Sequence, residues 1–246
     1  MRRSQHPLAS PALGRVVDLW IYGHYGQPIV VFPSASGMGD EWAARGMIHV
    51  LADLLERGRI KLYCVESNVG EAWTRSEGDP AWRIGRHLAY ERFVLDTLIP
   101  AIWADCGGPL PLAATGCSLG AFYAANLALK QPELCRWALC LSGRYEMRAL
   151  TGGFDSLEVY FNNPLAYVAN LHGEALARVR EQTSLTLVCG QGAWEEGCKE
   201  ETAALAGLLA AKGIPHELDL WGTDAAHDWE WWQRQASHHF HRRFAA

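Results

Sequence analysis

The chain has 246 residues, of which 49% are hydrophobic and 20% are charged. This composition is typical of a folded domain and excludes a disordered, collagen-like or coiled-coil protein. The formal net charge is -5, and the 22 Lys and Arg residues are scattered without a basic block. We therefore expect no nucleic-acid partner.

The N-terminal residues 1–7 contain two arginines and are followed by no apolar stretch. We interpret them as a frayed basic tail and not as a secretion signal. No apolar run approaches the roughly 18 residues that cross a bilayer, so we expect no membrane partner. The seven cysteines include no CxxC pair, which fits a reducing compartment. These features together predict a cytoplasmic protein.

Short apolar runs alternate with longer amphipathic stretches along the chain. Strands are expected at 16–22, 28–32, 60–66, 110–115, 136–142, 184–189 and 216–221. Helices are expected at 41–57, 83–103, 119–130, 202–212 and 229–244. The connections are too long for hairpins and require parallel pairing. The pattern predicts an α/β fold, with a mostly parallel, doubly wound sheet in one domain that spans 1–246.

Residues 150–183 interrupt this alternation with Gly152-Gly153 and Asn162-Asn163-Pro164. We expect a small cap-like excursion that roofs the pocket at the edge of the sheet. The aromatic residues of the last helix are candidates for a homo-oligomer interface.

The sharpest chemical signal is Gly116-Cys117-Ser118-Leu119-Gly120, which lies between an expected strand and an expected helix. In that context G-x-S-x-G forms a nucleophile elbow, a tight turn that requires small residues on both sides of the serine. The pattern predicts Ser118 as a nucleophile. The Cys117 side chain is expected to point into the core.

A serine nucleophile needs a histidine base and an acid that orients it, in the chain order nucleophile, acid, histidine. His227 is the histidine that follows the last strand in a loop before a helix. The acid is expected after strand 184–189, where Glu195 and Glu196 are available. We favour Glu195, with Glu196 as the alternative.

Acyl transfer also needs backbone amides that face the developing oxyanion. One is expected at Leu119, directly after the nucleophile. The second is expected in the small-residue loop 33–39, at Ala35 or, failing that, at Ser36. Ser36, Trp73 and Trp194 are candidate substrate-binding residues, because their loops fall at the expected catalytic edge.

No metal site is expected. His238, His239 and His241 crowd the last helix, but no cysteine or carboxylate stands at ligand spacing from them in the sequence. The proposed chemistry also requires no cofactor.

The residues Gly116-Cys117-Ser118-Leu119-Gly120-Ala121, Leu141-Ser142-Gly143, Gly190-Gln191-Gly192 and His227-Asp228-Trp229 resemble the Putative esterase family of α/β-hydrolases over about residues 25–240. That family includes esterase D, feruloyl and enterochelin esterases and the mycolyltransferases. The resemblance implies an α/β-hydrolase fold and serine esterase chemistry. It also implies oxyanion donors at Ala35 and Leu119, and its enzymes more often have Asp where Glu195 stands.

The sequence therefore predicts a serine carboxylesterase that cleaves a small-molecule ester through an acyl-enzyme, with Ser118, His227 and Glu195 as the triad. Two alternatives stay open at this point. One is an acyltransferase that uses the same triad, and the other is a catalytically silent hydrolase fold that acts as a binding module.

Overall fold

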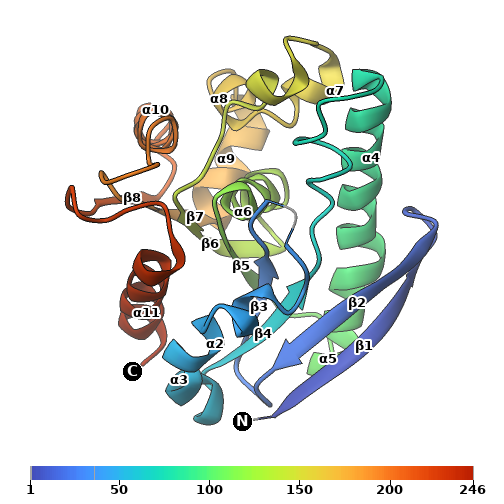
Figure 1. The fold of residues 1–246 in the computed structure, drawn as a ribbon, viewed down its shortest axis with the longest axis vertical. Coiled ribbons are helices and arrows are strands. Elements are labelled where there is room, and N and C mark those ends of the chain that lie inside the picture. The colour runs from blue at the N-terminus through green and yellow to red at the C-terminus, as the bar shows by residue number, and fades with distance from the viewer. Residues whose placement is uncertain (1, 36, 246) are drawn as a thin grey trace.

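A computed structural model describes residues 2–35 and 37–245. Its centre is a mixed sheet in the order β1-β2-β4-β3-β5-β6-β7-β8 (Figure 1). The strands are β1 Arg3–Ser10, β2 Arg15–Tyr22, β3 Gln27–Phe32, β4 Ile60–Val65, β5 Leu112–Cys117, β6 Cys135–Leu141, β7 Ser184–Cys189 and β8 His216–Leu220. From β4 to β8 all neighbours are parallel, whereas β2 pairs antiparallel with both β1 and β4. This confirms the expected α/β class and the mostly parallel sheet.

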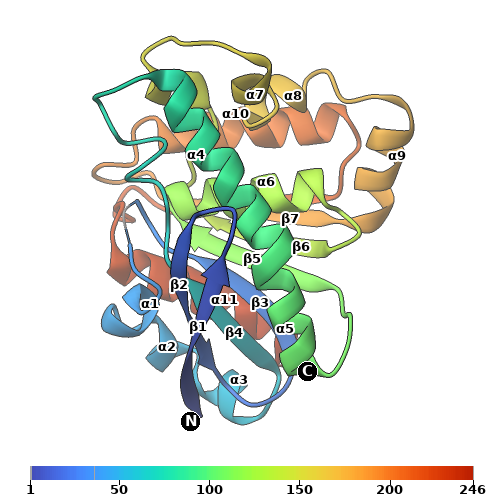
Figure 2. The same cartoon turned by 90° about the vertical axis from the view of Figure 1, so that its right-hand side faces the viewer.

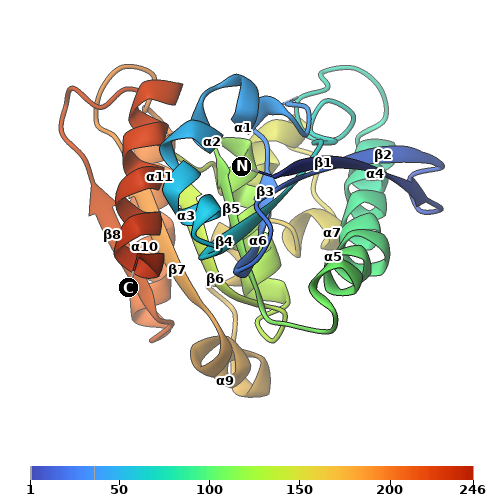
Figure 3. The same ribbon diagram turned by 90° about the horizontal axis from the view of Figure 1, so that it is seen from below.

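The N-terminal segment forms an edge strand, so the expectation of a frayed tail was wrong. β1 pairs with β2 along its whole length, from Arg3 opposite Tyr22 to Ser10 opposite Arg15. The guanidinium of Arg3 lies 4.3 Å from the centre of the Trp20 ring, which adds a cation–π contact across the pair. Local composition gave no sign of this strand, because its side chains are mostly exposed and form no apolar run. Figure 3 shows this β1–β2 hairpin at one edge of the molecule and β8 at the other.

Helices cover both faces of the sheet, as the doubly wound pattern predicts (Figure 2). One face packs against α1 Glu41–Ala44, α2 Met47–Val50, α3 Ala52–Glu56 and α11 Trp229–Phe244. The other packs against α4 Pro80–Phe93, α5 Ile99–Cys106, α6 Leu119–Lys130, α9 Gly173–Gln182 and α10 Cys198–Ala211.

The expected helix 41–57 is divided into the short helices α1, α2 and α3. Gly46 adopts a left-handed φ of 74° between the first two, which ends α1 and turns the chain. The expected helix 83–103 is continuous but passes through a π-helical turn at Val94–Leu98 before α5. Pro100, in the first turn of α5, has no amide to donate to the preceding turn, which favours this irregularity.

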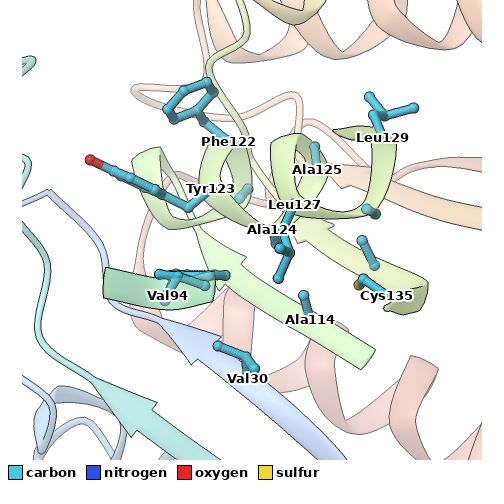
Figure 4. Close-up of a cluster of buried hydrophobic side chains, with 14 of the residues drawn as sticks. Val30, Val94, Ala114, Phe122, Tyr123, Ala124, Ala125, Leu127, Leu129 and Cys135 are labelled. Carbon is cyan, nitrogen blue, oxygen red and sulfur yellow. The ribbon is translucent and has the colours of Figure 1, made fainter. Parts of the chain in front are cut away.

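Helix α6, which directly follows Ser118, is buried along almost its entire length. Small residues, Ala121, Ala124 and Ala125 among them, let the helix lie close to the sheet, while Leu127 packs over the strands. Figure 4 shows this contact, with α6 above Val30 of β3 and Ala114 of β5. Close packing of α6 on the sheet fixes the position of its first turn.

The excursion consists of a 3-10 turn Met147–Thr151 and the short helices α7 Leu157–Tyr160 and α8 Pro164–Tyr167, followed by α9. It is fastened to α6 by polar contacts. Asn162 Oδ1 accepts hydrogen bonds of 2.8 Å from Asn126 and from Lys130, and the Tyr167 hydroxyl donates to Asn126. A roofing role for the excursion stays a prediction.

None of the described helices is both long enough and apolar enough to cross a membrane.

Candidate active site

Ser118 occupies a strained turn between β5 and α6. Its backbone has φ 55° and ψ -121°, a conformation that non-glycine residues adopt at a cost of about 1–3 kcal/mol. A Cβ atom on Gly116 would overlap the backbone of Gly120, and one on Gly120 would overlap the carbonyl of Phe32. Both glycines of the motif are therefore required by the close approach of β3, β5 and α6. The elbow geometry that the motif predicts is present.

The elbow also positions a backbone donor. The Ser118 amide donates to the Leu141 carbonyl at 2.8 Å, which ties the turn to the end of β6. Leu119 is the first residue of α6, so its amide is one of the four at a helix N-terminus that have no partner within the helix. This end of a helix carries partial positive charge and favours an anion.

The loop after β3 approaches the elbow from the neighbouring strand. Phe32 pairs with Gly116, and Ala35 follows three residues later. The Ala35 carbonyl accepts a 2.8 Å hydrogen bond from the Ser67 hydroxyl. Ser36 lies outside the described residues, so the structure says nothing of its expected role.

Glu41 holds the start of this loop. Its carboxylate accepts hydrogen bonds from the Ser34 amide at 2.8 Å and from the Ser34 hydroxyl at 2.7 Å. Burial raises the pKa of Glu41 despite these two hydrogen bonds. The loop is thus held at Ser34 by Glu41 and at Ala35 by Ser67.

His227 and Glu195 form a hydrogen-bonded pair. His227 Nδ1 lies 3.1 Å from Glu195 Oε2, and the glutamate is only 1% exposed. Oε1 accepts from the Ser142 hydroxyl at 2.5 Å and from the Gly190 amide at 3.2 Å. Burial by itself raises the pKa of Glu195, but the hydrogen bonds from His227 and Ser142 and the charge of His227 outweigh it, so the net pKa is lowered. The carboxylate is therefore ionised at neutral pH.

Glu196, the alternative acid, is exposed and lies next to Glu195 in the chain. The structure brings Glu195 to His227, and Glu196 has no hydrogen bond to that ring among the described contacts.

The loops that carry this pair interlock. The Gly192 amide donates to the Ala225 carbonyl at 2.8 Å, and the His227 amide donates to the Ala193 carbonyl at 2.9 Å. A Cβ on Gly190 would collide with the same Ala225 carbonyl. Since these loops follow the adjacent parallel strands β7 and β8, they emerge at the same edge of the sheet as the elbow after β5. Among the described contacts, the His227 ring makes no hydrogen bond to the Ser118 hydroxyl.

Ser142 is a site residue that the chemical analysis of the sequence missed. It is the first residue after β6, fully buried, with a left-handed φ of 49°. Besides donating to Glu195, its hydroxyl accepts from Trp232 Nε1 at 3.0 Å. Ser142 follows β6, which lies between β5 and β7, and this position could have predicted a place near the site. In the sequence, Leu141-Ser142-Gly143 contributed only to the family resemblance.

The two candidate tryptophans lie in different environments. Trp73 is 2% exposed, packs against Phe122 and donates from its indole to His87 Nδ1 at 3.1 Å. Trp73 was expected to line a substrate pocket, but its side chain lies in the interior. It is therefore not part of the proposed binding site. Trp194 is 81% exposed and adopts a left-handed φ of 66° beside Glu195.

Two groups of side chains within the described residues have the composition and spacing of metal ligands. Glu195, Cys198 and His227 form one, and Asp219, His238 and His239 form the other, with ligand atoms within 4.8 Å of one another in each. Sequence spacing missed the second because its carboxylate comes from β8, and His239 Nε2 lies 2.9 Å from Asp219 Oδ2.

Comparison with known proteins identifies the family. The family model described as "Putative esterase" matches residues 24–241. The chain belongs to the Putative esterase family. This confirms the resemblance found in the sequence and makes the protein a serine esterase by class. No curated protein matches the chain.

Solved structures of esterases share the fold of this family member. A ferulic acid esterase superposes with a TM-score of 0.76 at 16% identity, covering 96% of this chain and 95% of the other. MPT51 (FbpC1) of Mycobacterium tuberculosis superposes with a TM-score of 0.76 at 15% identity, covering 100% of this chain and 99% of the other. An S-formylglutathione hydrolase from Agrobacterium tumefaciens superposes with a TM-score of 0.74 at 13% identity, covering 97% of this chain and 92% of the other. These identities are low, and the likeness establishes the α/β-hydrolase fold.

Proposed function

We propose that the protein is a carboxylesterase that cleaves a small ester through a Ser118–His227–Glu195 triad and an acyl-enzyme. The observation that carries the proposal is the 3.1 Å contact between His227 Nδ1 and the buried Glu195 carboxylate, at the sheet edge where the strained Ser118 stands. A histidine base needs such a partner to fix its tautomer and to stabilise its charged form. Membership of an esterase family supports the reaction class.

The ionised Glu195 can only accept hydrogen bonds, so Nδ1 of a neutral His227 ring must carry the proton. Nε2 is then left with a free lone pair. In the proposed first step, Nε2 takes the proton of Ser118 as the hydroxyl oxygen attacks the ester carbonyl. The imidazolium then gives this proton to the leaving alcohol, and an acyl-enzyme remains. Water deprotonated by His227 releases the acid and restores Ser118.

The oxyanion of each tetrahedral intermediate is assigned to the amides of Leu119 and Ala35. The Leu119 amide stands at the helix N-terminus directly after the nucleophile, and the loop after β3 is held at Ala35 by Ser67 and at Ser34 by Glu41. One such donor is worth roughly 2.7–4 kcal/mol of transition-state stabilisation.

The proposal requires a hydrogen bond to form between the Ser118 hydroxyl and His227 Nε2 when substrate binds. Catalytic hydrogen bonds are often long in free enzymes and shorten in the complex. Trp194, exposed and adjacent to Glu195, is the proposed substrate contact.

Ser118→Ala tests the proposal. We expect it to lower the kcat for a short p-nitrophenyl ester by at least about 10³-fold and to abolish labelling by a fluorophosphonate probe. Ser237→Ala is the matched control, because Ser237 lies on α11 and contacts His241; it should retain both activities. Circular dichroism should show that both variants are folded. Full activity in a folded Ser118→Ala variant would remove the mechanism.

A further inference from the structure

A buried thiol that the proposed mechanism does not use lies beside the acid–base pair. Cys198 is the first residue of α10 and is 4% exposed. Its sulfur, a carboxylate oxygen of Glu195 and a ring nitrogen of His227 all lie within 4.8 Å of one another. Glu195 and Cys198 lie after β7 and His227 lies after β8, and hydrogen bonds between the two backbones keep the three residues near one another.

We propose that Cys198, Glu195 and His227 form an inhibitory site for a thiophilic divalent cation such as Zn²⁺. The inference deepens the proposed function, because it assigns a regulatory ligand to the same acid–base pair.

The donor set suits this class of cation. Zn²⁺ binds thiolate, imidazole and carboxylate at about 2.0–2.3 Å, and three protein ligands leave a fourth tetrahedral position for water. A thiolate excludes the hard cations Mg²⁺ and Ca²⁺, which prefer oxygen ligands. The separations of up to 4.8 Å must shorten by up to about 1 Å, through side-chain rotation, to reach tetrahedral geometry at these bond lengths.

Charge around the site also favours a cation. Glu195 supplies the negative charge, while Glu200 and Glu201 in the first turn of α10 are paired with Lys199 and Arg144. The nearby cation Arg144 is paired with Glu201 at 2.7 Å, which offsets its repulsion. Access is from the side of His227, whose side chain is 18% exposed, while Glu195 and Cys198 are covered.

Binding would stop the proposed chemistry at a defined atom. When Zn²⁺ takes the Nδ1 lone pair, the neutral ring must carry its proton on Nε2, which then cannot accept the proton of Ser118. The Cys198 thiol loses its proton to solvent as the Zn–S bond forms, and no oxidation takes place. The Glu195 carboxylate would also coordinate the cation, so its charge would no longer stabilise an imidazolium.

The test is Zn²⁺ inhibition of p-nitrophenyl ester hydrolysis by the full chain, freed of metal with a chelator. Each variant is compared with its own metal-free rate. We expect Zn²⁺ to inhibit the unmodified protein reversibly, with activity restored by EDTA. We expect Cys198→Ala to raise the half-inhibiting concentration by at least about tenfold.

Two control variants locate the effect. Cys106→Ala removes a partly exposed thiol that contacts Tyr63, and His238→Gln disables the second metal-like cluster. Both should retain the sensitivity of the unmodified protein. Inhibition that persists in Cys198→Ala, or that is lost in His238→Gln instead, would overturn the inference.

A direct binding measurement separates this inference from the proposed function. Cd²⁺ titration should produce the ultraviolet charge-transfer absorbance of a cadmium–thiolate bond, which should be lost in Cys198→Ala and kept in Ser118→Ala. If Ser118→Ala stays active while the Cd²⁺ signal depends on Cys198, the mechanism fails and the metal site stands. If hydrolysis depends on Ser118 but no Cys198-dependent signal appears, only the metal site is refuted.

Discussion

Ser142 donates a 2.5 Å hydrogen bond from its hydroxyl to Oε1 of Glu195, on the carboxylate oxygen that His227 does not contact. The same hydroxyl accepts from the Trp232 indole, so a relay of hydrogen bonds runs from α11 through the end of β6 to the acid. Since Ser142 is fully buried and held at a left-handed φ of 49°, its position is set by the fold. We regard it as a positioning residue for Glu195.

Ser142→Ala should destabilise the protein by about 1–3 kcal/mol, because it leaves the Trp232 indole and one lone pair of a buried carboxylate without partners. It should also lower kcat, by less than the loss of Glu195 does. Urea denaturation and steady-state kinetics with a p-nitrophenyl ester measure the two effects.

Ser142→Gly is the matched variant for backbone strain. It lacks the hydroxyl but accepts a positive φ without cost, so it should be more stable than Ser142→Ala while showing the same fall in kcat. If both variants keep full kcat, Ser142 has only a structural role.

Glu195→Gln should lower kcat by about 10²–10⁴-fold, since a neutral amide neither stabilises the imidazolium nor enforces the tautomer with Nδ1 protonated. Glu196→Gln, at the exposed neighbouring position, should stay within about twofold of the unmodified protein, as changes remote from the reacting groups usually do. The measurement is kcat at saturating ester for both variants. Equal losses in the two would refute the choice of acid.

The lowered pKa of Glu195 predicts how stability depends on pH. The folded-state pKa lies below that of the unfolded chain, about 4.3, so the unfolded state binds more protons as the pH falls. The stabilisation is present above that value and is lost as the pH drops through the folded-state pKa. The stability difference between the unmodified protein and Glu195→Gln should therefore shrink as the pH falls from about 5 towards the folded-state pKa. A constant difference in urea denaturation across this range would contradict the assignment.

Gly120→Ala should destabilise the protein by about 1–3 kcal/mol or prevent folding, because its methyl group would overlap the Phe32 carbonyl at the elbow. Gly207→Ala provides the opposite control. Gly207 lies inside α10 with nothing within 4 Å of an added Cβ, so alanine should stabilise by about 0.5–1 kcal/mol. Thermal denaturation of the two variants gives the comparison, and a stable Gly120→Ala would show that the elbow can open.

The elbow could be predicted from the sequence because its causes are local. Strand, tight turn and helix follow one another within a few residues of Ser118, and the steric need for Gly116 and Gly120 is written into the motif. The β-strands from β2 to β8 were similarly visible as apolar runs. The edge strand β1 was not, since its side chains are mostly exposed, and the division of helix 41–57 depended on the left-handed turn at Gly46.

The sequence by itself determined the fold class and predicted a candidate nucleophile and the loops around it, because short-range periodicity and sterics encode them. Only the tertiary structure decided that Glu195 and not Glu196 faces His227, and that Ser142 and Cys198 stand beside them. These residues come from loops after different strands, up to 85 positions apart in the chain. Their contacts form only when the parallel strands align and bring the loops together at one edge of the sheet. A local sequence pattern does not determine that arrangement.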